Sequence, residues 1–404
     1  MINKFLHNKS FRISILIFII TIQAGGLPIG STFVWWFIDF VTLYTIFQFR
    51  KKSTKYITIE LFMIWTLISL IRGALIAENY WEWKQLISGI LSLSIPICVY
   101  AFDKPIVTGT TLKFWFKYAL LFFIICLPQI ATGAYHFYLG PIFLIGCFIP
   151  IVPNKWKFIL ATLLIIMLLI NQDARSQVIK SAIVLVIAIC IYTSKFFFSN
   201  LILKIIHWAC YIIPIILLIL GVSGRFNIFQ DFPTLESKTI GVRNRDNIND
   251  QLSADTRTFI YVEVIESALK HNYTIWGRTP ARGNDSESFG TYNAEVLKTG
   301  KYERHKNELC HLNIFTWLGL IGVILYSLIY IRGSYLAIYK SNNIYIKFLG
   351  CFIAFRWAYG WIEDMNNFDI MNIALWMIIA MGQSQTFRMM NNKEFKKWIL
   401  KSLP

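Results

Sequence analysis

Residues 201–222 read LILKIIHWACYIIPIILLILGV, an apolar run whose one charged side chain is Lys204. A helix of this length is about 33 Å long, at about 1.5 Å per residue, whereas the hydrocarbon core of a bilayer is about 30 Å thick. The run is therefore predicted to cross a membrane as a single helix. Similar runs predict eleven further spans, at 12–29, 33–49, 57–76, 86–102, 112–130, 136–152, 158–170, 176–192, 312–331, 345–361 and 370–387.

The composition places most of the chain in lipid. Of its 404 residues, 56% are hydrophobic and 16% are aromatic, and the mean hydropathy is +0.54. A soluble domain needs a polar surface that this composition does not supply. The sequence therefore predicts an all-α fold, a polytopic transmembrane helical bundle of about twelve helices.

Basic residues set the expected orientation, because cytoplasmic loops of membrane proteins are enriched in lysine and arginine. With the N-terminus inside, the basic clusters between the predicted spans fall on the cytoplasmic side. Both termini are then cytoplasmic, and one large periplasmic loop follows the ninth span. The expected parts are spans one to nine in 1–222, the loop in 223–311, spans ten to twelve in 312–388 and a cytoplasmic tail in 389–404.

The formal net charge of +17 does not indicate nucleic acid. Residues 223–311 hold twelve basic and twelve acidic side chains, so the basic excess lies outside the loop, mostly in short cytoplasmic connections. No basic helix with interleaved aromatic residues lies outside the predicted spans. Six of the seven cysteines fall in predicted spans and no CxxC pair is present, which excludes a disulfide framework and a thiolate metal site.

One amphipathic helix is expected inside the periplasmic loop. The stretch 255–270 places Phe259, Val262 and Leu269 on one helical face. Because no soluble core is available beside it, this face is expected to rest on the outer end of the membrane bundle, like a lid. Residues 302–311 are expected to lead helically into the next span.

Charged groups in membrane spans are costly and are functional candidates by default. Three arginines project to the outer halves of their helices at similar depth, where guanidinium groups could hold phosphate oxygens by paired hydrogen bonds. The alternative is that each arginine reaches the outer headgroups or pairs with an acid nearby. The three arginines are Arg72, Arg175 and Arg356. Lys84 and Lys180 are two further basic residues that cytoplasmic loops do not explain, and the nearby acids are Asp173, Glu363 and Asp364.

The loop supplies a second group of candidates. Arg304 and Glu308 are four residues apart and would share a helical face, with His305 and His311 close by. A cation and a proton acceptor would then point together toward the membrane surface. An ordinary ion pair at a helix end is the alternative. Arg257 lies at the start of the amphipathic helix.

Several chemistries are excluded by missing motifs. The chain has no Walker loop, no GxSxG, no HExxH and no Asp-x-Asp pair. A reaction outside the membrane is therefore expected to use an activated donor, which for bacteria means a lipid-linked group. Transporters typically show inverted repeats and broken helices, and the sequence indicates neither.

Three stretches, in this order along the chain, resemble the bacterial O-antigen polymerase and ligase family of polytopic glycosyltransferases. Residues 173–177 (DARSQ) resemble the Ser-Arg motif that opens a membrane helix in that family. Residues 255–257 (DTR), followed by Gly277, resemble its Asp-x-Arg segment. Residues 304–322 (RHKNELCHLNIFTWLGLIG) resemble the exit from its periplasmic loop.

The resemblance implies an inverting transfer of a glycan from undecaprenyl pyrophosphate to a sugar hydroxyl, without metal, nucleotide or other cofactor, in the bacterial inner membrane. Arg175 and Arg257 are the expected ligands of the pyrophosphate. The second candidates for this role are Arg72, Arg304 and Arg356. The expected proton acceptor is Glu308 or, failing that, His311 or His305.

The family's ligases carry a histidine at the register that Glu308 occupies here, which favours a polymerase of O-antigen or capsular polysaccharide. A ligase that moves finished polymer to a lipid A core, and a flippase for the same lipid-linked glycan, are the alternatives. The expected partners are the lipid-linked oligosaccharide and a chain-length regulator and flippase of the same pathway.

Overall fold

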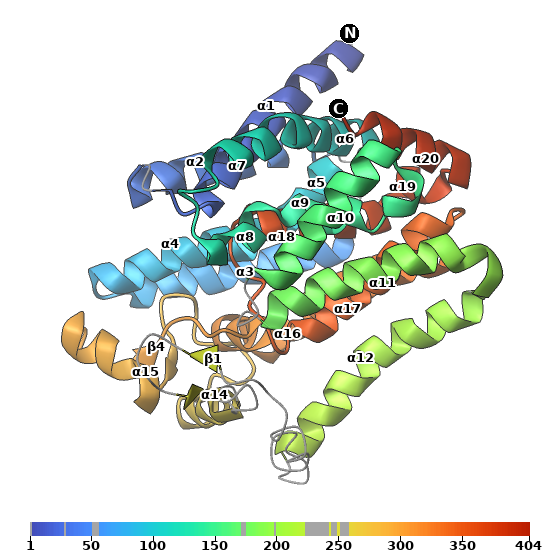
Figure 1. Cartoon of the computed structure of the whole chain (residues 1–404). Helices are drawn as coiled ribbons and strands as arrows, with labels where there is room; N and C mark the ends of the chain where they lie inside the picture. Colours follow the sequence, from blue (N-terminus) through green and yellow to red (C-terminus); the bar gives the residue numbers. More distant parts are fainter. Residues whose placement is uncertain are drawn as a thin grey trace.

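The computed structural model describes residues 2–27, 30–50, 56–170, 175–197, 199–222, 242–243, 249–250 and 258–404. This part of the chain is almost entirely helical (Figure 1), which confirms the all-α prediction. The helices before residue 223 are α1 (Ile2–Ala24), α2 (Thr32–Phe47), α3 (Ile57–Ile76), α4 (Tyr80–Ser94), η1 (Ile95–Cys98), α5 (Val99–Phe102), α6 (Pro105–Phe114), η2 (Trp115–Ala119), α7 (Leu120–Cys126), η3 (Thr132–Ala134), α8 (Tyr135–Tyr138), α9 (Gly140–Gly146), η4 (Ile149–Ile151), α10 (Asn154–Leu169), α11 (Arg175–Phe197) and α12 (Asn200–Val222).

The second part of the chain adds helices and two short antiparallel strand pairs. The helices are α14 (Thr258–Lys270), α15 (Glu287–Thr291), η6 (Tyr292–Val296), α16 (Cys310–Tyr339), α17 (Ile344–Tyr359), α18 (Ile370–Gln383), α19 (Gln385–Met389) and α20 (Asn392–Lys401). The strands are β1 (Val242–Arg243) with β2 (Asn249–Asp250), and β3 (Asn284–Asp285) with β4 (Glu303–Arg304).

Six helical segments in the described part are long and apolar enough to cross a membrane. They are Ile57–Ile76, Tyr80–Phe102, Pro105–Cys126, Ser176–Thr193, Asn200–Gly221 and Cys310–Tyr339. The helices Thr32–Phe47 and Ile370–Gln383 are apolar but shorter. These helices mark the chain as a membrane protein, and the count of about twelve spans stays a prediction.

The predicted span at 136–152 is wrong as a single helix. The segment consists of α8, α9 and η4. Pro141 lies in the first turn of α9 and Pro150 in the first turn of η4. Proline lacks the N–H that a continuing helix would use, so each one starts a new short helix.

Residues 258–309 gather beside α3, α4 and α16 at one end of the bundle, whereas both chain ends lie at the opposite end (Figure 1). We call the end of the bundle that carries residues 258–309 the loop end. The helix expected at 255–270 is present as α14, but it buries a different face. Ile260 and Val264 pack against Leu309 and Leu312 at the start of α16, whereas Val262 and Leu269 are exposed.

The expectation of a helix over 302–311 is also wrong. Glu303 and Arg304 form strand β4, and helix α16 begins only at Cys310. Asparagine side chains hold the intervening turn, because Asn313 accepts from the Asn307 N–H at 2.6 Å and donates back to the Asn307 carbonyl at 2.9 Å. Such local side-chain hydrogen bonds compete with helix formation.

Helix α16 is broken at Gly319, where φ is +67° and ψ is −170°. The sequence had indicated no broken helix, so this expectation is wrong. The backbone groups freed by the break are satisfied from outside the helix: Leu320 N donates to the Thr274 carbonyl at 2.8 Å, and Trp65 Nε1 donates to the Leu318 carbonyl at 2.9 Å. In lipid a broken helix needs such partners.

Candidate functional site

The loop end is organised by residues 273–283, which lie against α3 and the break in α16. The backbone N–H groups of Arg278 and Thr279 donate to the carbonyls of Thr316 and Trp317, at 2.7 and 3.1 Å. Thr279 has a φ of +80°, which is rare for a β-branched residue. Such strain persists where the surroundings over-determine the backbone, and it is typical of functional segments.

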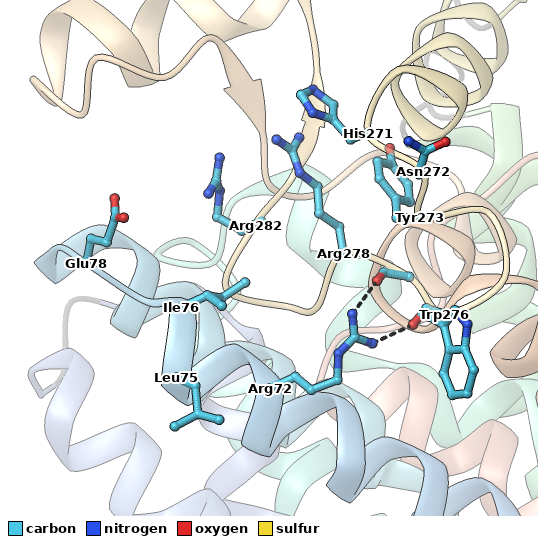
Figure 2. Close-up of a pocket in the computed structure, with 11 residues that line it drawn as sticks. Arg72, Leu75, Ile76, Glu78, His271, Asn272, Tyr273, Trp276, Arg278 and Arg282 are labelled. Carbon is cyan, nitrogen blue, oxygen red and sulfur yellow. Dashed lines mark hydrogen bonds between the residues drawn. The ribbon is translucent and has the colours of Figure 1, made fainter.

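A cavity of about 680 Å³ opens between this segment and the end of α3 (Figure 2). We call it the arginine cavity. Its volume is within the range of about 300–1,000 Å³ that is usual for small-molecule sites. Three arginines in its wall make it a candidate site for an anion. The lining residues are Arg72, Leu75, Ile76, Glu78, His271, Asn272, Tyr273, Trp276, Gly277, Arg278 and Arg282.

Arg72 reaches from α3 across to the loop (Figure 2). Its Nη1 donates to the Trp276 carbonyl at 3.0 Å and its Nη2 to the Gly277 carbonyl at 3.2 Å. Within the described part of the chain no carboxylate pairs with Arg72. Glu78 is the one acid in the cavity wall, and it pairs instead with Lys301 at 2.6 Å. The positive charge of Arg72 is therefore not neutralised by an acid among the described residues around it.

The other two arginines of the cavity are held by acids of the loop. Arg278 lies 3.0 Å from Asp285 and 3.0 Å from Glu303, and Arg282 makes two hydrogen bonds from its Nε to Glu303, at 3.1 and 3.0 Å. This network joins the segment 277–283 to strands β3 and β4. It fixes the direction of both guanidinium groups.

The acids of this network stay ionised. Burial by itself raises the pKa of Asp285, but hydrogen bonds from Lys270, His271 and Arg278 lower it to about 2. Burial likewise raises the pKa of Glu303, and its two arginine partners lower it below the usual range. The arginine cavity therefore keeps its ion pairs throughout the neutral and mildly acidic range.

A second group of charges is buried inside the bundle. Glu363 accepts from Lys180 at 2.6 Å and from Arg356 at 3.0 Å, and both cations are 2% exposed. Burial by itself raises the pKa of Glu363, but the two cations lower it to about 2. We call these three residues the buried ion cluster. Here Arg356 pairs with a nearby acid, which was the alternative to an anion site.

Arg304 is not among the residues that line the arginine cavity. Its guanidinium stacks on Phe289, with 4.1 Å between the guanidinium carbon and the ring centre, and one of its nitrogens lies 3.6 Å from Glu308. The expected pair of Arg304 and Glu308 is thus present, although the chain between them is not helical.

The three expected proton acceptors differ in exposure, and none lines the arginine cavity. Glu308 is exposed at the surface of the loop. His305 is buried, and its Nδ1 is 3.1 Å from the Asn293 amide nitrogen. His311 is buried in the first turn of α16, and its Nε2 lies 2.9 Å from the Trp357 carbonyl. The role of each stays a prediction.

The side chains of the two arginines expected to bind pyrophosphate are not among the described parts of the chain. Arg257 falls outside the described residues. Arg175 is the first residue of α11, and its side chain falls outside them too. Two residues on, Gln177 donates to Glu363 at 3.4 Å, so the start of α11 lies beside the buried ion cluster at the loop end.

Sequence reasoning did not identify Arg278 and Arg282 as candidate site residues. They belong to residues 277–283 (GRTPARG), where two arginines alternate with turn-forming residues. Two glycines and a proline around two cations are a usable signal for a fixed, basic turn. Their ion-pair partners could not be read from spacing, because Glu303 lies more than twenty residues further along the chain.

Comparison of the chain with protein-family models, with curated proteins and with solved structures found no match in any of the three.

Proposed function

We propose that this chain is a glycosyltransferase of the bacterial inner membrane that polymerises oligosaccharide repeat units linked to undecaprenyl pyrophosphate. The product would be O-antigen or capsular polysaccharide, made on the periplasmic face. The observation that carries the proposal is the arginine cavity, where the charge of Arg72 has no acidic partner in the described structure. A lipid-linked glycan as the substrate is supported by the similarity of residues 173–177, 255–257 and 304–322 to the polymerase and ligase family.

The cavity suits a pyrophosphate leaving group. A guanidinium has five N–H donors, and the two hydrogen bonds from Arg72 to carbonyls use only two of them. The remaining donors can meet phosphate oxygens as negative charge grows during cleavage of the sugar–phosphate bond. Arg278 and Arg282 extend the positive wall, and their acids hold them in place.

The proposal places about twelve spans in the membrane, with both termini in the cytoplasm and residues 223–311 outside. Support comes from the basic clusters of the short connections and from the packing of residues 258–309 at the end of the bundle opposite to the chain ends. The arginine cavity would then open at the periplasmic side, where the lipid-linked repeat units are joined.

The acceptor hydroxyl needs a base in this reaction. Glu308 is proposed for it, since it is the exposed member of the three candidates and lies beside Arg304. His305 and His311 follow it in order of exposure. Arg175 and Arg257 keep their proposed role as further ligands of the pyrophosphate.

One observation favours a flippase as the second candidate. Helix α16 is discontinuous at Gly319, and the loop segment fills the break. Discontinuous helices often form the substrate sites of transporters. A lipid-linked glycan would then be bound by the arginines and moved, without transfer.

Deletion of the gene in its host separates these functions. The surface glycan is resolved on a gel, and the lipid-linked pool is assigned to a membrane face. Collapse of the ladder to one repeat unit on its acceptor supports the polymerase. Long polymer that stays on the carrier lipid indicates a ligase, and repeat units trapped on the cytoplasmic face indicate a flippase. An unchanged ladder contradicts all three.

A further inference from the structure

A second cavity, of about 470 Å³, lies at the loop end between α1, α2 and α4. Helix α2 contributes Thr32, Trp35, Trp36 and Asp39, whose spacing of three, four and seven residues puts them on one face. Helix α4 contributes Gln85, Ser88, Gly89 and Ser92 with the same spacing. Two helical faces of aromatic and small polar residues thus face one space, which we call the tryptophan cavity.

The rest of its wall is also aromatic and polar. Trp317 and Phe368 add two more rings, and Gln23 and Asn367 add amide groups. Aromatic rings offer flat, apolar faces, while amides and hydroxyls fix the orientation of a polar ligand. A sugar ring has the matching chemistry, since it presents C–H groups on its faces and hydroxyls around its edge.

Asp39 is the most informative residue of this wall. It is only 3% exposed, and its Oδ1 has no hydrogen-bond partner among the described residues. The Oε1 of Gln23, in the same wall, is also buried without a partner. Buried acceptors are nearly always satisfied in native proteins, and leaving one without a donor costs free energy. Both oxygens therefore call for donors from a molecule in the cavity.

The protein's own cation does not meet this need. Lys306 lines the cavity, but its Nζ lies 2.9 Å from Asp364 and also donates to the side chain of Asn367. Its charge is thus already matched by an acid. What Asp39 and Gln23 lack are N–H or O–H donors, and a sugar supplies several hydroxyls close together.

The two cavities are neighbours across the loop segment 277–283. Gly277, Arg278 and Arg282 line the arginine cavity, while Pro280 packs on Gly89 of the tryptophan cavity so closely that a Cβ on Gly89 would lie 2.3 Å from the Pro280 Cβ. A glycan that spans this segment could meet both sites.

We infer that the tryptophan cavity is a sugar-binding site, in which Asp39 and Gln23 accept hydrogen bonds from sugar hydroxyls and the indole rings stack on the sugar. The identity of the sugar, a residue of the repeat unit, rests on the proposed function. The site itself rests on the unpaired acceptors and the aromatic wall.

The test uses the full-length chain in nanodiscs and, as probe, the repeat-unit oligosaccharide released by mild acid from the lipid-linked pool of the host. Calorimetry compares the unaltered chain with Asp39→Asn, which keeps the shape of the side chain, and with Trp36→Ala. The matched control is Glu287→Gln, an exposed acid outside both cavities. Melting temperatures verify that each variant is folded.

We expect saturable binding by the unaltered chain, weakened at least about tenfold in Asp39→Asn, because the new amide group replaces one acceptor oxygen with an NH₂ group that cannot accept a hydrogen bond from a hydroxyl. Trp36→Ala should weaken binding as well, and Glu287→Gln should not change it. Absence of binding by the unaltered chain overturns the inference. Binding by Asp39→Asn and Trp36→Ala that is as tight as that of the unaltered chain also overturns it. Loss of a co-purifying phospholipid in Asp39→Asn, without an effect on the oligosaccharide, overturns it in favour of a lipid headgroup.

Arg72→Gln separates this inference from the proposed function. The free oligosaccharide carries no pyrophosphate, so this variant should bind it as well as the unaltered chain does. If the glycan ladder survives gene deletion but binding still depends on Asp39, the proposed function is wrong and the sugar site stands. If the ladder collapses but binding ignores Asp39, the sugar site is wrong and the proposed function stands.

Discussion

Arg72 and Arg356 both lie near the loop end of the bundle, but their surroundings are opposite. Arg356 belongs to the buried ion cluster, where Glu363 and a second cation match its charge. Among the described residues Arg72 donates hydrogen bonds to two carbonyl oxygens and pairs with no acid, and it faces a cavity of about 680 Å³. The difference teaches that depth in a membrane helix does not distinguish an ion-paired arginine from one that faces open space with no acidic partner among the described residues.

Glu363→Ala should give the largest effect and would test the structural half of this comparison. It leaves Lys180 and Arg356 buried without their acid, which is expected to lower the free energy of unfolding by about 3–5 kcal/mol. Unfolding of the purified protein in detergent measures this. The matched control is Glu60→Ala, which breaks a partly exposed pair with Arg50 and should cost less than about 1 kcal/mol. Equal losses would contradict the role of the cluster.

Arg72→Gln tests the functional half. Loss of a preorganised donor to the leaving group is expected to lower polymer formation by about 10²–10³-fold, while the melting temperature hardly changes. Chain growth is scored from the ladder of surface glycan, with protein abundance measured in parallel. Arg12→Gln, at an exposed position of α1, is the control. A normal ladder from Arg72→Gln would remove the arginine cavity from the proposed mechanism.

Gly319→Ala breaks the support of the arginine cavity without touching its charges. At a φ of +67° a Cβ would lie 2.1 Å from the Ile275 carbonyl, so the loop that carries the acceptors of Arg72 must move. A backbone with φ +67° and ψ −170° is essentially limited to glycine, so its strain alone should cost about 1–3 kcal/mol of stability. Gly333→Ala in the same helix is the control, since its Cβ would meet Ile379 at an ordinary 3.5 Å. Similar stability and ladders for both variants would contradict this reason for the break.

Acidification should give the smallest effect, and it acts on the loop through His305. Burial lowers the pKa of His305 below its usual 6.5, so the unfolded chain takes up a proton more readily than the folded one. The contribution of His305 to stability is thus fully present above about pH 6.5 and falls below it, by at most about 1.4 kcal/mol per pH unit. Glu363 of the buried ion cluster stays ionised there, because its pKa is about 2. Thermal unfolding between about pH 8 and pH 5 measures the slope. His305→Gln should make the slope less steep than that of the unaltered chain, and an unchanged slope would contradict a contribution from His305.

Helix α14 shows what local pattern can predict and where it stops. Its existence follows from helical spacing in residues 255–270, but two apolar faces are available there. Leu309 and Leu312, far along the chain, select the face of Ile260 and Val264. A similar limit explains residues 302–311, where Asn307 pairs with Asn313 in place of a helical turn.

The sequence by itself determined that the chain is a helical membrane protein, because the length and apolarity of its runs must match a bilayer whatever their neighbours are. It also determined which arginines are candidates, because a charge in an apolar run is visible without a structure. Only the tertiary structure showed that Arg356 is ion-paired, since Glu363 reaches Arg356 and Lys180 through the packing of α11 against α17. The arginine and tryptophan cavities likewise depend on the tertiary structure, because their walls come from parts of the chain that are far apart in sequence.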